Sequence, residues 1–144
     1  MDTNRIERRV GVRATADRLW ELISDFGSWG RWNPYETDLS GAIVYGGRIS
    51  LTERMPGLPE RTVQAQIGEW QPRAQLVWSE KRGLWFNSVR YFEIEELEPG
   101  SCILANGAIF SGLRGELHHD KHRRGYKAAF EEIAENLRKA AEAG

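Results

Sequence analysis

The stretch YKAAFEEIAENLRKAA, residues 126–141, carries an apolar residue at every third or fourth position. This spacing puts the apolar side chains on one face of an α-helix and the charged ones on the other. It predicts an amphipathic helix of about 25 residues that begins near residues 114–116. Such a helix buries its apolar face against one partner layer, so the rest of the chain should supply a sheet. The apolar face comprises Tyr126, Ala129, Phe130, Ile133, Ala134, Leu137 and Ala141.

The chain before this helix has the alternation and the turns of an antiparallel sheet. In residues 5–12, Ile6, Val10 and Val12 share one face of a strand, and Arg8 is the exception on that face. Glycine and proline turns separate the later strands, and strands joined by short turns predict a meander. The first strand must join that sheet at an edge or between its ends. The later strand candidates lie near 38–45, 48–55, 61–70, 75–82, 85–97 and 102–111.

Two short helices are predicted after the first strand. Thr15 has the residue type of an N-cap, and Gly27 has that of the residue after a helix C-terminus. Residues 28–32 can form one more turn, which Pro34 stops. The predicted fold class is α+β: a seven-stranded antiparallel sheet curved around the long C-terminal helix, in a single domain over residues 1–144. One helix should not fill the space under a strongly bent sheet, so we expect an internal cavity.

The composition argues against several classes of protein. The 20 basic and 21 acidic residues nearly cancel and are scattered, whereas a nucleic-acid or membrane-surface protein would show a basic patch. No apolar run approaches the roughly 18 residues of a membrane span. The single cysteine, Cys102, cannot form an internal disulfide, and with no signal peptide in the sequence we expect a cytoplasmic protein. The many aromatic residues would allow a homodimer.

Several motifs resemble those of the SRPBCC superfamily, which includes START domains, polyketide cyclases/dehydrases and birch-pollen-allergen-like proteins. Residues 14–26 (ATADRLWELISDF), with Trp29 and residues 32–34 (WNP), resemble its amino-terminal signature. Residues 101–112, which end in Phe-Ser-Gly, resemble its penultimate strand, and the closing helix resembles its "grip" helix. The resemblance covers essentially the whole chain. It implies a helix-grip fold and a cavity for a small molecule, but not a particular function, because only some members are enzymes.

Period-2 alternation predicts which side chains line the cavity. Arg90 and Phe92 share a face, and apolar walls with a few polar groups suit a small hydrophobic or amphiphilic ligand. Glu80 could contact the ligand or pair with Arg90 as a structural bridge, and reversed parity would place both outside. The direction of Arg8 is equally open. The predicted ligand-binding residues are Trp32, Leu51, Val63, Trp78, Glu80, Phe86, Ser88, Arg90, Phe92, Asn106, Ala108, Phe110, Tyr126 and Phe130.

A histidine cluster near the start of the long helix raises the question of a metal site. His118 and His122 lie one helical turn apart, a spacing that can hold zinc. A third ligand such as Asp120 would point elsewhere on the helix, and Lys121 and Arg124 would repel a cation. We therefore predict a solvated helical turn, no metal and no cofactor.

Two further segments leave alternatives open. Residues 54–59 (RMPGLP) could be a gate over the cavity, as such loops are in the family that the chain resembles, or an ordinary turn. Trp29 and Trp32 could cap the pocket or seal the short helices against the sheet. Cys102 has no basic neighbour in sequence to lower its pKa, so an inert buried thiol is predicted. Groups for acid–base chemistry in the cavity would be Glu80, Arg90, Tyr91 and Asn106.

These patterns support three hypotheses about function. The first is a non-enzymatic carrier or sensor that binds a small hydrophobic or amphiphilic molecule in the internal cavity. The second is a cyclase/dehydratase-type enzyme that acts on a polyketide in the same cavity. The third is a chaperone-type interaction module, which an exposed apolar patch away from the cavity would distinguish.

Overall fold

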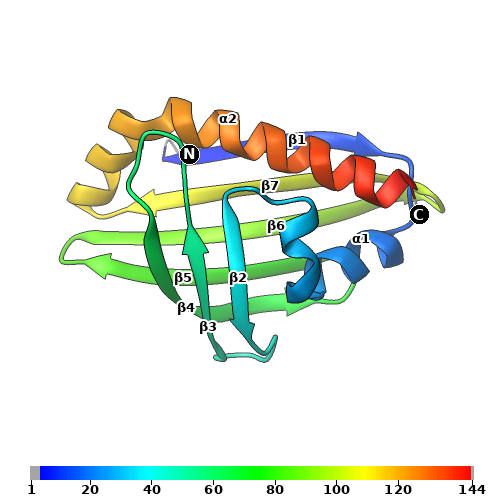
Figure 1. Ribbon diagram of the computed structural model, residues 1–144, viewed down its shortest axis with the longest axis horizontal. Coiled ribbons are helices and arrows are strands. Elements are labelled where there is room, and N and C mark those ends of the chain that lie inside the picture. The colour runs from blue at the N-terminus through cyan, green and yellow to red at the C-terminus, as the bar shows by residue number, and fades with distance from the viewer. Residues whose placement is uncertain (1–3, 144) are drawn as a thin grey trace.

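The computed structural model describes residues 4–143, in which one curved sheet packs against one long helix (Figure 1). The sequence-predicted order of elements is confirmed. In chain order they are β1 (Arg5–Val12), α1 (Ala16–Ser24), the 3₁₀ helix η1 (Phe26–Arg31), β2 (Glu36–Gly41), β3 (Arg48–Glu53), β4 (Arg61–Gln71), β5 (Gln75–Gly83), β6 (Phe86–Glu98), β7 (Ser101–Ser111) and α2 (Leu113–Ala143).

The strands form a seven-stranded antiparallel sheet in the order β1-β7-β6-β5-β4-β3-β2. Strands β2 to β7 make the predicted meander, and β1 joins it at the edge beside β7. Register shifts interrupt four of the pairings, β2–β3, β4–β5, β5–β6 and β6–β7. Such irregularities bend and twist strands. In Figure 1, β2 and β3 accordingly run across the direction of β6 and β7, so the sheet encloses space on the side of α2.

Helix α2 buries the apolar face that its sequence pattern predicts. All seven residues of that face are buried, and the side chains of Phe130, Ile133 and Leu137 are fully inaccessible to solvent. The helix has 31 residues and begins at Leu113, so it is longer than predicted. Its first turns continue almost directly from β7.

Helix α1 begins as predicted and ends differently. The Thr15 hydroxyl accepts a hydrogen bond from the Arg18 amide at 3.1 Å, which confirms the N-cap. The prediction that Gly27 follows the helix C-terminus is wrong, because α1 ends at Ser24 and Gly27 lies inside η1. There the Asp25 carboxylate accepts from the Gly27 amide at 3.1 Å, so Asp25 caps the start of η1.

The structure also settles the direction of Arg8. Its side chain reaches the edge of α2, where its guanidinium lies 3.8 Å from the Glu131 carboxylate, and both side chains are exposed. Arg8 therefore keeps its charge in solvent beside α2 and does not enter the core. Within residues 4–143 no helix has an apolar run long enough to cross a bilayer.

Candidate functional site

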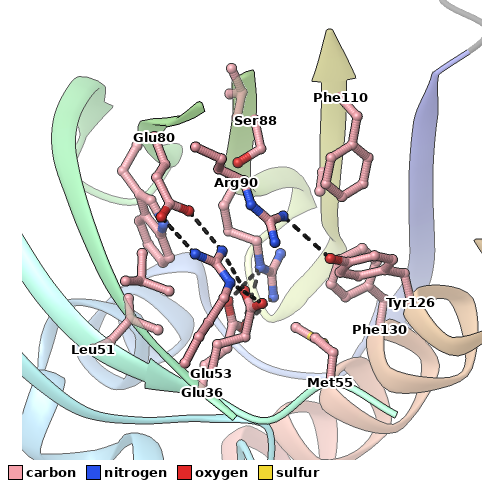
Figure 2. A pocket seen from close by; sticks show the side chains of 16 residues that line it. Glu36, Leu51, Glu53, Met55, Glu80, Ser88, Arg90, Phe110, Tyr126 and Phe130 are labelled. Atoms are coloured by element: carbon pink, nitrogen blue, oxygen red, sulfur yellow. Dashed lines mark hydrogen bonds and ion pairs between the residues drawn. The ribbon is translucent and has the colours of Figure 1, made fainter. Parts of the chain in front are cut away.

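A pocket lies between the concave face of the sheet and α2 (Figure 2). Its walls come from β3, β4, β5, β6 and β7 on one side and from Tyr126 and Phe130 of α2 on the other. Its free volume is about 20 Å³, which is room for about one water molecule. The predicted cavity is therefore present only as a small pocket. Side chains fill most of the space that the helix leaves free.

An aromatic cluster fills one part of this space. The ring centroid of Trp29 lies 4.8 Å from that of Trp32, 5.2 Å from that of Phe92 and 5.7 Å from that of Trp78. The Trp29 indole donates to the Ile23 carbonyl at 2.9 Å, which satisfies its only donor. Trp29 and Trp32 thus seal the short helices against the sheet. Of the predicted ligand contacts, Trp32 and Phe92 belong to this packed core and do not line the pocket.

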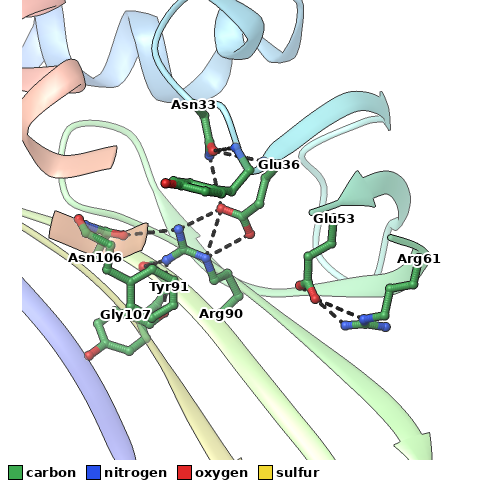
Figure 3. Close-up of polar contacts among 10 residues, drawn as sticks. Asn33, Glu36, Glu53, Arg61, Arg90, Tyr91, Asn106 and Gly107 are labelled. Atoms are coloured by element: carbon green, nitrogen blue, oxygen red, sulfur yellow. Dashed lines mark hydrogen bonds and ion pairs between the residues drawn. The ribbon is translucent and has the colours of Figure 1, made fainter. Parts of the chain in front are cut away.

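A buried salt bridge fills the middle of the space (Figure 3). Arg90 is 7% exposed and lies between the rings of Phe92 and Phe130, at 4.5 and 4.4 Å from their centroids. Its Nη2 donates to the Glu36 carboxylate at 2.8 Å, and Glu36 is 1% exposed. The predicted alternative, a salt bridge between Glu80 and Arg90, is wrong: Arg90 pairs with Glu36 and Glu80 pairs with Arg61. The reason is the curl of the sheet, which brings the first residue of β2 across the interior to β6.

All five N–H donors of Arg90 have an acceptor. Nε donates to the Glu36 carboxylate at 2.9 Å, Nη1 to the carbonyls of Tyr91 and Gly107, and Nη2 to Glu36 and to Asn106 Oδ1. Asn106 in turn donates to the Phe130 carbonyl of α2 at 3.1 Å. Asn106 therefore supports Arg90 and does not line the pocket, although it was a predicted ligand contact. With its donors saturated, Arg90 is held as a structural group.

A second ionic network lies at the pocket wall. The Arg61 guanidinium donates to Glu80 at 2.7 Å and to Glu53 at 3.0 Å, so one cation bridges two carboxylates. Burial raises the pKa of Glu53, and the nearby charge of Glu36 acts in the same direction, while Arg61 opposes both. Glu53 therefore takes up a proton more readily than a carboxylate in water does.

At the far end of the pocket Tyr126 meets a histidine. The Tyr126 hydroxyl lies 2.7 Å from His118 Nε2, and Arg82 donates to the same hydroxyl at 3.4 Å. Burial and the charge of Arg82 lower the pKa of His118 to about 4, so its ring is neutral at pH 7 and Nε2 can accept a hydrogen bond from the tyrosine hydroxyl. Burial, with the charge of Glu53, raises the pKa of Tyr126 to about 12.

Phe86 and the two histidines lie just outside this end. The Phe86 ring packs 4.9 Å from His118, and the Arg82 guanidinium lies 4.6 Å from its centroid, so Phe86 packs against two residues at this end. It does not line the pocket, contrary to the prediction. The rings of His118 and His122 are 4.7 Å apart. Among residues 4–143, no three His, Cys, Asp or Glu side chains come together as a metal site would require.

The segment 54–60 closes the pocket on the side of α2. Met55 is 3% exposed and lines the pocket, as Figure 2 shows. The segment lies directly against α2 at Gly125, where a Cβ would stand 2.6 Å from the Pro56 carbonyl oxygen. Glycine at this position therefore allows the segment to lie flat on the helix, with the flexible Met55 side chain beneath it.

The structure brings most of the predicted site residues together around the pocket. These are Leu51, Val63, Trp78, Glu80, Ser88, Arg90, Ala108, Phe110, Tyr126 and Phe130, and their contact with a ligand stays a prediction. Sequence reasoning missed Glu36, Glu53, Met55, Arg61, Arg82 and Val89. The strand parities could have found some of these, since Glu53 and Arg61 alternate in step with Leu51 and Val63. Glu36 gave no signal, because its partner lies 54 residues away.

The remaining candidates for chemistry face other ways. The Tyr91 hydroxyl donates to Glu7 of β1 at 2.5 Å, so Tyr91 points away from the pocket. Cys102 is buried at the β1 edge of β7, its thiol lies 3.3 Å from the Ala14 carbonyl oxygen, and burial raises its pKa. A raised pKa leaves the thiol protonated and unreactive.

The curved sheet, the closing helix and the pocket between them define a helix-grip protein of the SRPBCC superfamily. More specifically, the chain belongs to the family described as polyketide cyclase / dehydrase and lipid transport, whose model matches residues 3–142. Family and fold together suggest a domain that binds a small molecule. No curated protein matches the sequence significantly.

Solved structures with the same fold are distant in sequence. Hypothetical protein jhp0584 from Helicobacter pylori has 13% identity and a TM-score of 0.76, and the match covers 97% of this chain and 89% of that one. The di-domain ARO/CYC StfQ of the steffimycin biosynthetic pathway has 13% identity and a TM-score of 0.75, over 97% of this chain and 51% of that one. A Thalictrum norcoclaurine synthase point mutant has 14% identity and a TM-score of 0.68, over 95% and 92%. At these identities the likeness shows the fold alone.

Proposed function

We propose that this protein binds a small amphiphilic molecule in the pocket between the sheet and α2. The observation that carries the proposal is the set of charged side chains that surround a pocket in an otherwise apolar interior. Buried ion pairs contribute little to stability compared with apolar residues of the same volume. The ligand's apolar part would pack on Leu51, Val63 and Phe130, and its polar group would meet Glu53 and Arg61 at the pocket wall.

Binding requires the pocket to open. An apolar cavity that holds benzene measures roughly 150 Å³, whereas this pocket offers about 20 Å³. The missing volume, roughly 130 Å³ by the same comparison, has to come from side chains that move aside. Met55 and the segment 54–60 are the parts that can do so, because the segment belongs to no strand or helix and Met55 is flexible. The segment therefore acts as the gate, the first of its two predicted alternatives.

The test is native mass spectrometry of the purified protein after incubation with lipid and polyketide extracts. We expect a saturable mass adduct, and a stronger one in Gly125→Ala, because the added Cβ pushes the segment off α2. Gly11→Ala is the matched control, since its Cβ meets no atom within 4 Å. If folded wild-type and Gly125→Ala proteins both retained nothing, the proposal would be wrong.

One observation favours a second candidate function, a cyclase/dehydratase-type enzyme that uses the same pocket. Tyr126 lines the pocket, and its hydroxyl is hydrogen-bonded to a neutral histidine and lies beside a guanidinium. A protonated tyrosine hydroxyl can act as a general acid that donates its proton to the oxygen of a bound carbonyl compound. Consumption of a bound polyketone that Tyr126→Phe abolishes, with binding retained, would make the protein an enzyme. Binding without turnover would make it a carrier or sensor.

A further inference from the structure

Four apolar side chains stand in solvent at one end of the molecule. Leu84 and Trp85 form the turn between β5 and β6, and Leu113 and Leu117 lie on the first turns of α2; they are 70, 63, 64 and 62% exposed. The two segments touch, because the Arg114 amide donates to the Trp85 carbonyl at 3.0 Å. In Figure 1 the β5–β6 turn and the start of α2 lie together at the left end. We call these four residues the tip surface.

The turn between β5 and β6 places a bulky residue where glycine or asparagine is usual. Trp85 has φ +61°, the left-handed region, which costs a bulky residue roughly 1–3 kcal/mol. Gly112 packs against it so closely that a Cβ there would lie 2.2 Å from the Trp85 carbonyl oxygen. The fold thus fixes a large indole in an exposed position, and the packing of the core does not account for it.

Both segments that form the tip surface carry basic residues, of which Lys81, Arg82, Arg114 and Lys121 lie nearest to it in the sequence and Arg123, Arg124 and Lys127 lie further along α2, beside β1. Lys81 and Arg82 precede the β5–β6 turn, and α2 carries further basic residues after Leu113. Residues 113–127 contain Arg114, Lys121, Arg123, Arg124 and Lys127 against Glu116 and Asp120, although the whole chain has a net charge of −1. Arg114 in the first helical turn also opposes the helix dipole, so helix stability does not explain it. The composition gave no sign of a basic patch, because the fold brings together segments that lie 30 residues apart in the sequence.

We propose that the tip surface docks on an anionic lipid bilayer. Exposed Trp and Leu side chains enter the boundary between headgroups and acyl chains, and nearby Lys and Arg side chains attract anionic lipids. A second copy of the chain fits less well, because a two-fold contact would bring the basic residues of both copies, such as Lys81 and Arg114, close together. A stable protein interface also uses about 20–30 residues a side, far more than this surface offers. The docking surface adjoins the pocket through Arg82, which lines the pocket and covers Phe86.

The test is co-sedimentation of the full chain with vesicles, and it needs no pocket ligand. We expect binding to vesicles of phosphatidylcholine mixed with phosphatidylglycerol, weaker binding in high salt, and little binding to phosphatidylcholine alone. The double variant Leu84→Ser/Trp85→Ser should bind about tenfold more weakly or worse. Leu97→Ser is the matched control: it is 58% exposed near the other end of β6 and should bind as the wild type does.

A second double variant, Leu113→Ser/Leu117→Ser, keeps the test decisive if the turn variant fails to fold. It changes exposed helix positions only and should weaken binding to a similar extent. The proposal is overturned if the folded wild type does not bind the mixed vesicles in low salt, or if both double variants bind as tightly as Leu97→Ser. Self-association without vesicles that Trp85→Ser abolishes would overturn it in favour of a protein contact.

Discussion

Replacing Arg90 with methionine should destabilise the protein by about 3–5 kcal/mol, since it leaves a buried carboxylate without its partner. Glu36 is 1% exposed, and in the wild type it accepts from Arg90 Nε at 2.9 Å and from Nη2 at 2.8 Å. Methionine keeps the aliphatic volume between the rings of Phe92 and Phe130, so the loss measures the charge and its hydrogen bonds. For a chain of this size, the melting temperature should fall by roughly 6–20 °C.

Urea unfolding of the single variants and of the double variant Arg90→Met/Glu36→Gln measures the coupling. We expect the double variant to recover about 2 kcal/mol of the summed loss, because neither partner is then left charged and alone. Arg8→Met is the control: its partner Glu131 lies 3.8 Å away in solvent, and the change should cost less than about 1 kcal/mol. If Arg90→Met cost no more than Arg8→Met, the account of the buried network would be refuted.

Three further predictions concern the pocket. Met55→Ala should lower the free energy of unfolding by about 2–5 kcal/mol, because the smaller side chain leaves a cavity. A loss under about 1 kcal/mol would contradict this and would mean that residues 54–60 move inward to fill the cavity. Stability should fall as the pH drops from about 6.5 to about 4, because only the unfolded state protonates His118 in that window; His118→Gln should flatten the urea midpoint over this range. Gly125→Ala should speed amide exchange in residues 54–60 while Gly11→Ala does not, and equal exchange would show that the segment does not rest on α2.

The fold could be predicted from the sequence because it depends mainly on local sequence patterns. The period of α2, the Thr15 cap and the glycine turns between strands each depend on a few neighbouring residues. The face that each strand presents to the helix followed from the same alternation, which is why the predicted residues Leu51, Val63 and Phe110 line the pocket.

The free volume and the ion pairs could not be predicted in this way. They depend on how strongly the sheet curls, and that is set by irregular pairings such as the shift between Ile67 and Trp70. Because the sheet curls, Glu36 forms a salt bridge with Arg90, and Glu80 forms one with Arg61 instead. Phe86 lies on the same face of β6 as Ser88 and Arg90, but the pocket ends at Ser88, so Phe86 lies outside it. Alternation gives the face of a strand on which a side chain lies, not how far along the strand the pocket extends.

The contact between Glu36 and Arg90 has a mechanical consequence. It joins β2 to β6 across the concave face of the sheet, although β5, β4 and β3 separate these two strands in the sheet order. This link holds the two strands at a fixed separation, so the sheet resists flattening. In the binding that we propose, the ligand therefore enters and leaves past residues 54–60, without a change in the sheet.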